Sequence, residues 1–263
     1  MKTLIALLIC CLSFPTFADP LKKVTLISMD IPPFMSPKLP EQGAAIYGLR
    51  HIFKKIGYDL EVRFVPIQRT RNVGMSDNRI NGFFPSFVDD DFVQGMTLSK
   101  IVYKTPWVVA ERKDKPIHWK VPADLLKYKG GNVGGYTLRS QVADVFKGKE
   151  GALEEAPKDI QNILKLANKR IDYIFIDQNV LKFILATDPQ AQPYAQILQI
   201  NQKMVALNEY GIAFKQNAES KKIMEEFNKV ANEEDFTKAV EGYIKTYMPA
   251  PPSPTPPAAK KTP

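Results

Sequence analysis

Cysteine and histidine are scarce in this chain, which restricts the chemistry it can carry. Of its 263 residues, two are cysteine and two are histidine. Both cysteines lie within the first eleven residues, so the rest of the chain can form neither a disulfide bond nor a thiolate metal site. His51 and His118 have no second ligand at metal-binding spacing. There is no nucleophile elbow, HExxH pattern or phosphate-loop ending, so we expect no metal, no cofactor and no catalysis.

Long apolar runs are absent except at the N-terminus. Lys2 precedes the apolar run Leu4–Leu12, which Phe14-Pro15 then breaks, and Thr16-Phe17-Ala18 places small residues before Asp19. The run is about half as long as a membrane-spanning helix. This pattern predicts a signal peptide at 1–18, cleaved on export to the periplasm. An uncleaved membrane anchor is the alternative.

The net charge gives little information about a binding partner. The net charge of +8 is spread along the chain without a dense basic cluster. This charge could attract an anionic ligand, but no motif supports binding to nucleic acid.

Residues 249–263 contain seven prolines in fifteen positions and almost no large apolar groups. Such a segment cannot bury enough surface to offset its ordering entropy, so we expect a disordered tail, with a spacer or docking peptide as the alternative.

The region between these ends alternates strand and helix patterns. Helical stripes include 46–56, closed by Gly57 at a left-handed C-cap, and 140–146, 160–167, 180–186, 223–230 and 236–244. The strand candidates are Val24–Met29, Leu60–Val65, Ile80–Phe84, Thr105–Glu111, Asn132–Gly135, Ile171–Ile176, Gln196–Ile200 and Tyr210–Lys215. Strands separated by helices predict an α/β fold with mainly parallel sheets covered on both faces.

Several short stretches, in their order and spacing, resemble a known family. They are Asp30-Ile31-Pro32-Pro33-Phe34, Gly48–Gly57, Pro66–Arg69 with Asn78–Gly82, Leu98-Ser99 with Tyr103, Lys169–Asp172 with Asp177, and Tyr210–Phe214. From about Val24 to Met248, the chain resembles the family 3 extracellular solute-binding proteins of amino-acid-type ABC transporters.

The resemblance implies a two-lobed periplasmic-binding-protein fold of type II, with two crossover strands between the lobes. Lobe 1 would comprise 19–110 and 211–248, and lobe 2 would comprise 111–210. A small polar solute, an amino acid or a related compound, would bind in the cleft between them and be delivered to an inner-membrane ABC permease. The protein would be a monomer without enzymatic activity.

The resemblance also nominates charged groups for the ligand. Asp177 matches the ammonium-binding position, although an aspartate directly after a strand also suits a helix N-cap. The family's carboxylate-binding arginine is absent, because the corresponding stretch contains the acidic run Asp89–Asp91. Arg69 and Arg139 are the two possible substitutes. Without that arginine, a standard α-amino acid is a less secure ligand.

The remaining site candidates come from three loops. The glycine loop before Tyr136 and Thr137 would turn backbone N–H groups toward the ligand, or serve as a plain strand-to-helix turn. Further expected ligand contacts are Asp30, Phe34 and Ser86. Aromatic side chains at Phe84, Tyr103 and Trp107 would line the cleft or belong to the core.

Two other functions remain open for the same scaffold. A sensory receptor without a transporter would bind the same kind of solute and use the proline-rich tail to contact a partner. An enzyme of the cyclohexadienyl-dehydratase type, or the binding half of a lytic transglycosylase, would need a general acid or base in the cleft. Glu111 is the candidate for that role.

Overall fold

The computed structural model describes residues 21–248 apart from 67–68, 70–75, 88–94 and 150. The expected signal peptide at 1–18, the acidic run at 89–91 and the proline-rich tail at 249–263 therefore lie outside the described residues. Of the described helices, none is both long and apolar enough to cross a membrane. In chain order the elements are β1 (Lys22–Ser28), η1 (Pro40–Gln42), α1 (Ala44–Lys55), β2 (Tyr58–Phe64), β3 (Gly82–Ser86), β4 (Met96–Leu98), β5 (Tyr103–Arg112), η3 (Pro122–Lys127), β6 (Gly130–Val133), α3 (Ser140–Phe146), β7 (Leu153–Ala156), α4 (Asp159–Ala167), β8 (Tyr173–Asp177), α5 (Gln178–Thr187), η4 (Gln192–Tyr194), β9 (Leu198–Lys215), α6 (Ala218–Val230) and α7 (Glu233–Tyr247).

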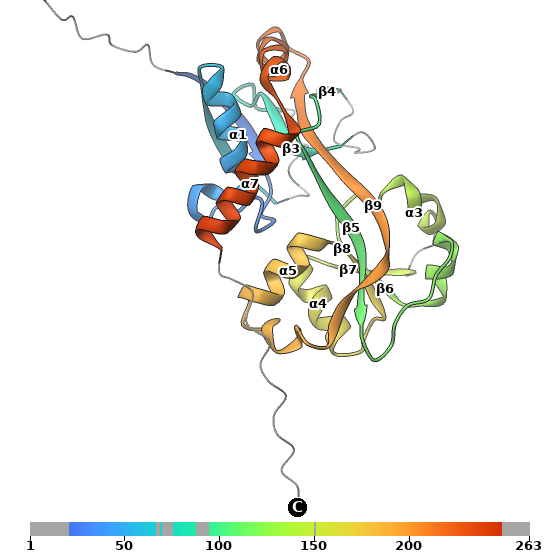
Figure 1. The fold of residues 1–263 in the computed structure, drawn as a ribbon. Helices are drawn as coiled ribbons and strands as arrows, with labels where there is room; N and C mark the ends of the chain where they lie inside the picture. Colours follow the sequence, from blue (N-terminus) through green and yellow to red (C-terminus); the bar gives the residue numbers. More distant parts are fainter. Residues whose placement is uncertain (1–20, 67–68, 70–75, 88–94, 150, 249–263) are drawn as a thin grey trace, which may run out of the picture.

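The nine strands pair in the order β2-β1-β3-β9-β5-β8-β6-β7, with β4 beside β9, and they form two groups that are joined through β9 and β5 and are each flanked by helices (Figure 1). In the first, β1 pairs in parallel with β2 and β3, while β4 and the end of β9 join in antiparallel orientation. In the second, β6 pairs in parallel with β7 and β8, and β5 runs antiparallel to β8. The prediction of a two-lobed α/β fold with mainly parallel sheets is confirmed.

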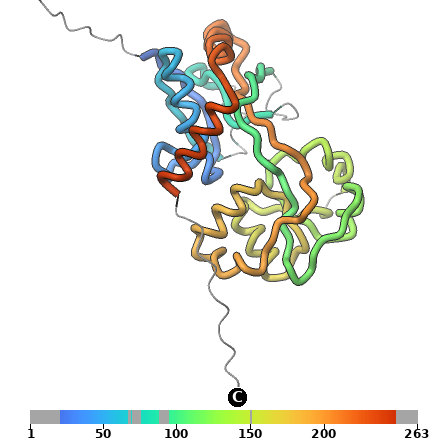
Figure 2. The backbone as a smooth tube through the Cα atoms, viewed as in Figure 1, coloured from blue at the N-terminus to red at the C-terminus, as the bar shows by residue number. Residues whose placement is uncertain are grey.

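Two long strands connect the lobes. β5 and β9 pair in antiparallel orientation from Tyr103 opposite Tyr210 to Arg112 opposite Leu198, and Figure 2 shows them side by side from one lobe to the other. The prediction of separate strands at 196–200 and 210–215 was wrong, because β9 is continuous over 18 residues. Its middle exposes Gln202, Lys203 and Met204 in succession, and this interrupts the apolar pattern that marks a strand.

The first lobe combines both ends of the described chain. Helix α1 lies beside α7, as the blue and red segments of Figure 1 show. The predicted apolar stripe of α1 is buried, and Phe53 contacts Phe227 of α6 with ring centroids 5.2 Å apart. Tyr47 and Tyr243 make a similar contact between α1 and α7, at 5.7 Å.

The core of the second lobe reaches up to the cleft. Trp107 of β5 stacks on Phe175 of β8 with ring centroids 4.7 Å apart, and Phe146 of α3 meets the same ring edge-on at 5.8 Å. This packing fixes the indole of Trp107, which forms part of the cleft wall.

Two glycines, one after a helix and one inside a helix, allow a test of backbone conformation. Gly57 follows α1 with φ of 78°, the left-handed conformation predicted for it, and a Cβ there would meet no atom within 4 Å. Gly57→Ala is therefore expected to lower the free energy of unfolding by about 1 kcal/mol, because alanine resists positive φ. Gly242 lies exposed inside α7, where a Cβ is equally unhindered, so Gly242→Ala should raise it by about 0.5–1 kcal/mol. Urea unfolding of both variants would measure the two changes in the free energy of unfolding. Changes of the same sign would contradict the left-handed conformation of Gly57 or the helical position of Gly242.

Candidate functional site

The two lobes meet around two small adjoining cavities. The larger, about 70 Å³, is lined by Met29, Ile31, Pro85, Phe87, Trp107, Gly135, Tyr136, Thr137, Arg139 and Tyr210. The smaller, about 30 Å³, is lined by Ile31, Phe34, Met35, Ala45, Phe84, Pro85, Tyr103, Asp177, Val180 and Tyr210. Both sets draw on strands and loops of the two lobes. The cavities therefore occupy the cleft that the two connecting strands span.

Asp177 is both a helix cap and a group facing the cleft. It ends β8, and its Oδ1 atom accepts hydrogen bonds from the amides of Asn179 and Val180 at 2.8 and 3.3 Å, which cap α5. Its Oδ2 atom is buried and receives no hydrogen bond from any residue that the structure describes. A buried carboxylate oxygen without a donor is rare in proteins. The two interpretations of this residue are compatible because each uses a different oxygen.

The surroundings of Asp177 disfavour its negative charge. Burial raises the pKa of Asp177 to about 6, although the amides of Asn179 and Val180 and the nearby side chains of Thr105 and Asn208 act to lower it. A cation beside Oδ2 would compensate for the lost hydration and supply the missing hydrogen bond. The smaller cavity thus suits a positively charged group of the ligand.

A second buried carboxyl lies behind the wall of the larger cavity. Asp159, the first residue of α4, accepts a hydrogen bond from the Tyr136 hydroxyl at 3.2 Å. Burial raises the pKa of Asp159 to about 7, and the charge of Asp177 contributes to the rise. In the sequence this residue reads as an ordinary first-turn acid of a helix, so only the fold reveals its link to the cleft.

Arg139 is the cationic group of the larger cavity. Its guanidinium carbon lies 3.5 Å from the centroid of the Phe87 ring and 5.6 Å from that of Trp107. Its Nε donates to Asn208 Oδ1, and Nη1 donates to the Thr137 carbonyl at 3.2 Å. Arg139 comes from the second lobe and Phe87 from the first, so the stacking joins the two sides of the cleft. Sequence reasoning selected Arg139 but missed Phe87 and Asn208.

The glycine loop contributes side chains more than amides. Gly135, Tyr136 and Thr137 line the larger cavity, with Gly135 at φ of 88°. However, the amide of Gly134 donates to Ala156 and that of Tyr136 donates to Val133, at 2.9 and 3.0 Å. These two amides are therefore used within the second lobe, in contrast to the expectation that the loop turns its N–H groups to the ligand.

Of the other residues expected to contact the ligand, one lines a cavity and three do not. Phe34 is buried against the smaller cavity. Ser86 is fully buried at the end of β3 but lines neither cavity. Asp30 is exposed, because Met29 and Ile31 on either side of it turn toward the cleft. Arg69 is also exposed and lines neither cavity, which leaves Arg139 as the arginine that lines the cleft among the described residues.

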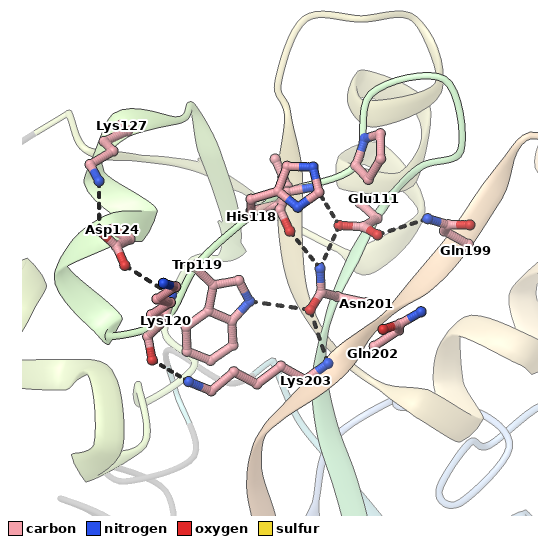
Figure 3. A pocket seen from close by; sticks show the side chains of 12 residues that line it. Glu111, His118, Trp119, Lys120, Asp124, Lys127, Gln199, Asn201, Gln202 and Lys203 are labelled. Atoms are coloured by element: carbon pink, nitrogen blue, oxygen red, sulfur yellow. Dashed lines mark hydrogen bonds and ion pairs between the residues drawn. The ribbon is translucent and has the colours of Figure 1, made fainter.

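Glu111 belongs to a different hollow, of about 670 Å³, on the second lobe (Figure 3). It lies four residues beyond Trp107 along β5 and is 2% exposed. Oε1 accepts from Gln199 Nε2 at 2.8 Å, and Oε2 accepts from the Ile117 amide at 2.8 Å and from Asn201 Nδ2 at 2.7 Å. Both oxygens thus hold the segment after β5 against β9. Glu111 is not positioned as a general acid or base of the cleft.

Metal chemistry finds no support in the part of the chain that is described. His51 and His118 are both exposed, and no three histidine, cysteine or acidic side chains among the described residues gather around a point that could hold an ion.

Comparisons with known proteins agree with this architecture. No family model and no curated protein matches the sequence. Among solved structures, an amino acid ABC transporter substrate-binding protein from Streptococcus pneumoniae, bound to L-arginine, superposes with a TM-score of 0.63 at 18% identity, covering 85% of this chain and 94% of that one. The fold is that of the two-lobed solute-binding proteins.

Two further structures extend the comparison beyond transport. The GluR0 ligand-binding core of Nostoc punctiforme, in complex with L-glutamate, gives a TM-score of 0.63 at 19% identity over 86% of this chain and 100% of that one. A histidine kinase sensor domain with similarity to periplasmic binding proteins gives 0.66 at 15% identity, over 88% and 98%. At these identities the likeness establishes the fold, and it is shared by transport and signalling proteins.

Proposed function

We propose that this protein captures a small amine-bearing solute in its interlobe cleft and releases it unchanged. The observation that carries the proposal is the buried, unpartnered Oδ2 atom of Asp177 at the smaller cavity. A buried carboxylate in apolar surroundings is stable only when it is paired, and an ammonium group supplies both the charge and the hydrogen bond. The neighbouring walls are apolar or aromatic, which suits the binding of a molecule more than chemistry on it.

Arg139 supports the extension of this proposal to zwitterions. Its guanidinium borders the larger cavity together with Thr137 and Tyr136. A guanidinium pairs well with a carboxylate, and stacking on Phe87 holds it in place. Arg139 would thus replace the arginine that the family carries in the stretch outside the described residues. The ligand would be an amino acid or a related compound.

The cellular setting is also a proposal. We propose that residues 1–18 form a cleaved signal peptide, that the mature chain is a periplasmic monomer, and that the proline-rich tail at 249–263 is disordered. The lobes would comprise 19–110 with 211–248, and 111–210. The partner would be an inner-membrane ABC permease. The shared fold with an amino acid ABC transporter substrate-binding protein of Streptococcus pneumoniae supports this proposal.

A sensory role is the second candidate. A histidine kinase sensor domain superposes over 88% of this chain, and this similarity supports a sensory role. It supports sensing as well as the similarity to transporter binding proteins supports uptake. In that case the same cleft would bind the same solute, and closure of the lobes would be read by a signalling partner. Uptake of radiolabelled solute by cells lacking this protein separates the two roles: reduced uptake supports transport, and unchanged uptake supports sensing.

A thermal-shift screen tests the binding function itself. Amines, amino acids and small carboxylates are added to the purified protein, because selective binding stabilises the folded state by about 2.7 kcal/mol at a hundred times the dissociation constant. We expect amines and zwitterions to raise the melting temperature and simple carboxylates to leave it unchanged. A screen in which no amine raises it would contradict the proposal.

Arg139 gives a second test, with Arg69 as a matched control. Arg139→Ala is expected to weaken binding of the best amino acid by roughly thirtyfold or more, since the half-buried partner of its carboxylate is lost. The same variant should leave binding of a simple amine nearly unchanged. Arg69→Ala removes an exposed arginine and should change neither. Calorimetric titration of the three proteins would check this, and equal losses for the amino acid and the amine would contradict the assignment.

A further inference from the structure

The cleft is divided, and the division separates its two charged groups. Asp177 lines the smaller cavity only, and Arg139 lines the larger cavity only. Ile31, Pro85 and Tyr210 line both, so they form a partition between the two spaces. The carboxylate of Asp177 and the guanidinium of Arg139 thus border different cavities, and no ion pair joins them within the described chain.

Rigid parts of both lobes build the partition. The Tyr210 hydroxyl accepts a hydrogen bond from Asn208 Nδ2 at 2.8 Å, and its ring meets the edge of Phe87 with centroids 6.3 Å apart. Ile31 is anchored by its amide, which donates to the Met35 carbonyl at 2.7 Å. Pro85 is buried within β3. A ligand must therefore fit around these side chains, because each is held by its own packing or hydrogen bonds.

We propose that the solute carries its ammonium and its carboxylate on different carbons, joined by a few methylene groups that cross the partition. Such a molecule is a short ω-amino acid. This inference rests on the proposed function, since it assigns the ammonium to Asp177 and the carboxylate to Arg139. An α-amino acid bears both charges on one carbon, so it would have to place both in the same cavity and leave one protein group unpaired.

The walls and volumes agree with this class of solute. The partition presents a proline ring, an aliphatic side chain and an aromatic ring, surfaces against which methylene groups pack without losing hydrogen bonds. The cavities are small, at about 70 and 30 Å³, so they favour a short chain over a long branched side chain. The spacing between the charges thus becomes the feature that the cleft selects.

An isomer pair tests the inference directly. γ-Aminobutyric acid and α-aminobutyric acid have the same atoms and the same charges and differ only in charge spacing. By isothermal titration calorimetry we expect the γ isomer to bind on the order of tenfold or more tightly, because only it pairs both charges. Butylamine and butyrate, each with one charged end, should bind more weakly than the γ isomer.

The partition can be tested with Tyr210. Tyr210→Phe keeps the ring and should preserve the preference for the γ isomer, whereas Tyr210→Ala joins the cavities and should reduce it at least severalfold. Circular dichroism and the melting temperature verify that both variants fold. If Tyr210→Ala does not fold, Tyr210→Leu, which retains an apolar side chain without the ring, takes its place.

The other outcomes separate this inference from the proposed function. Equal or tighter binding of the α isomer, lost in Asp177→Asn, would overturn the inference and leave the proposed function standing. Binding of γ-aminobutyric acid no tighter than butylamine would also overturn it, since Arg139 would then not take the carboxylate. If neither isomer nor any simple amine bound, both the inference and the proposed function would be overturned.

Discussion

Replacing Asp177 with asparagine is expected to weaken the binding of every amine solute by roughly thirtyfold to several thousandfold, because truncating one partner of a buried charge pair costs about 2–5 kcal/mol. The cause is local. Oδ2 of Asp177 is buried and accepts no hydrogen bond of normal geometry from the described residues, so an ammonium beside it would lose the counter-charge that it pairs with. Calorimetric titration of wild type and variant with the best amine measures the loss.

The asparagine substitution is chosen because it preserves the second role of this residue. Oδ1 of Asp177 caps α5, and asparagine caps a helix about as well as aspartate does. A loss of binding in Asp177→Asn can therefore be assigned to the charge, provided that circular dichroism shows an intact fold. Asp144→Asn serves as the matched control, since Asp144 is exposed on α3 and lines neither cavity. Affinity within a factor of about three of wild type for Asp177→Asn would remove the residue from the ligand site.

The sequence was informative about Asp177 for a physical reason. A carboxylate directly after a buried strand lies at the carboxyl end of a sheet, where ligands of α/β folds bind. The same position begins a helix, so the sequence could not decide between a cap and a ligand group. In the structure Oδ1 of Asp177 caps the helix and Oδ2 accepts no hydrogen bond from the described residues, so the cap does not preclude the proposed ligand role.

Residues brought to the cleft by tertiary packing were harder to find. Asp159 is the first residue of α4, and its burial depends on Tyr136, which lies 23 positions earlier in the chain. Phe87 was grouped with the acidic turn that follows it, and its stacking under Arg139 joins two segments that are far apart in the sequence. The continuous β9 was missed for a related reason. Its central residues are exposed on one side, so local hydrophobicity does not reveal a strand that β5 holds in place.

The same pattern of burial predicts an unusual response to pH. The ligand-free protein is expected to become less stable as the pH rises from about 4 to about 8. Burial raises the pKa of Asp177 to about 6 and that of Asp159 to about 7, both above the ordinary value of 3.8. A carboxyl group whose pKa is raised by folding binds its proton more tightly in the folded state. Its protonation therefore favours folding, and that advantage is lost as the pH passes through the interval between 3.8 and the raised values.

The size of the effect follows from the shifts. One pKa unit corresponds to about 1.4 kcal/mol, so the rises from 3.8 to about 6 and to about 7 should together cost about 7 kcal/mol across this interval. The other ionisable groups of the cleft keep the same protonation state over this pH interval. Burial raises the pKa values of Tyr103, Tyr136 and Tyr210 further above neutrality, and arginine keeps its charge. Surface acids act in a different interval. Hydrogen bonds and ion pairs lower the pKa values of acids such as Asp114, so their stabilisation is lost only below about pH 4.

Urea unfolding at about pH 4.5 and pH 7.5 would measure this dependence in wild type, Asp159→Asn and Asp177→Asn. Each substitution removes one of the two raised groups and should flatten the decline, whereas Asp144→Asn should keep the wild-type slope. An amine solute should reverse part of the decline in wild type, because it stabilises the ionised form of Asp177 at the higher pH. Stability that is constant or rises over this interval in the ligand-free protein would show that the two carboxyl groups are not held in a dry cleft, and it would remove the electrostatic reason for expecting a cationic ligand.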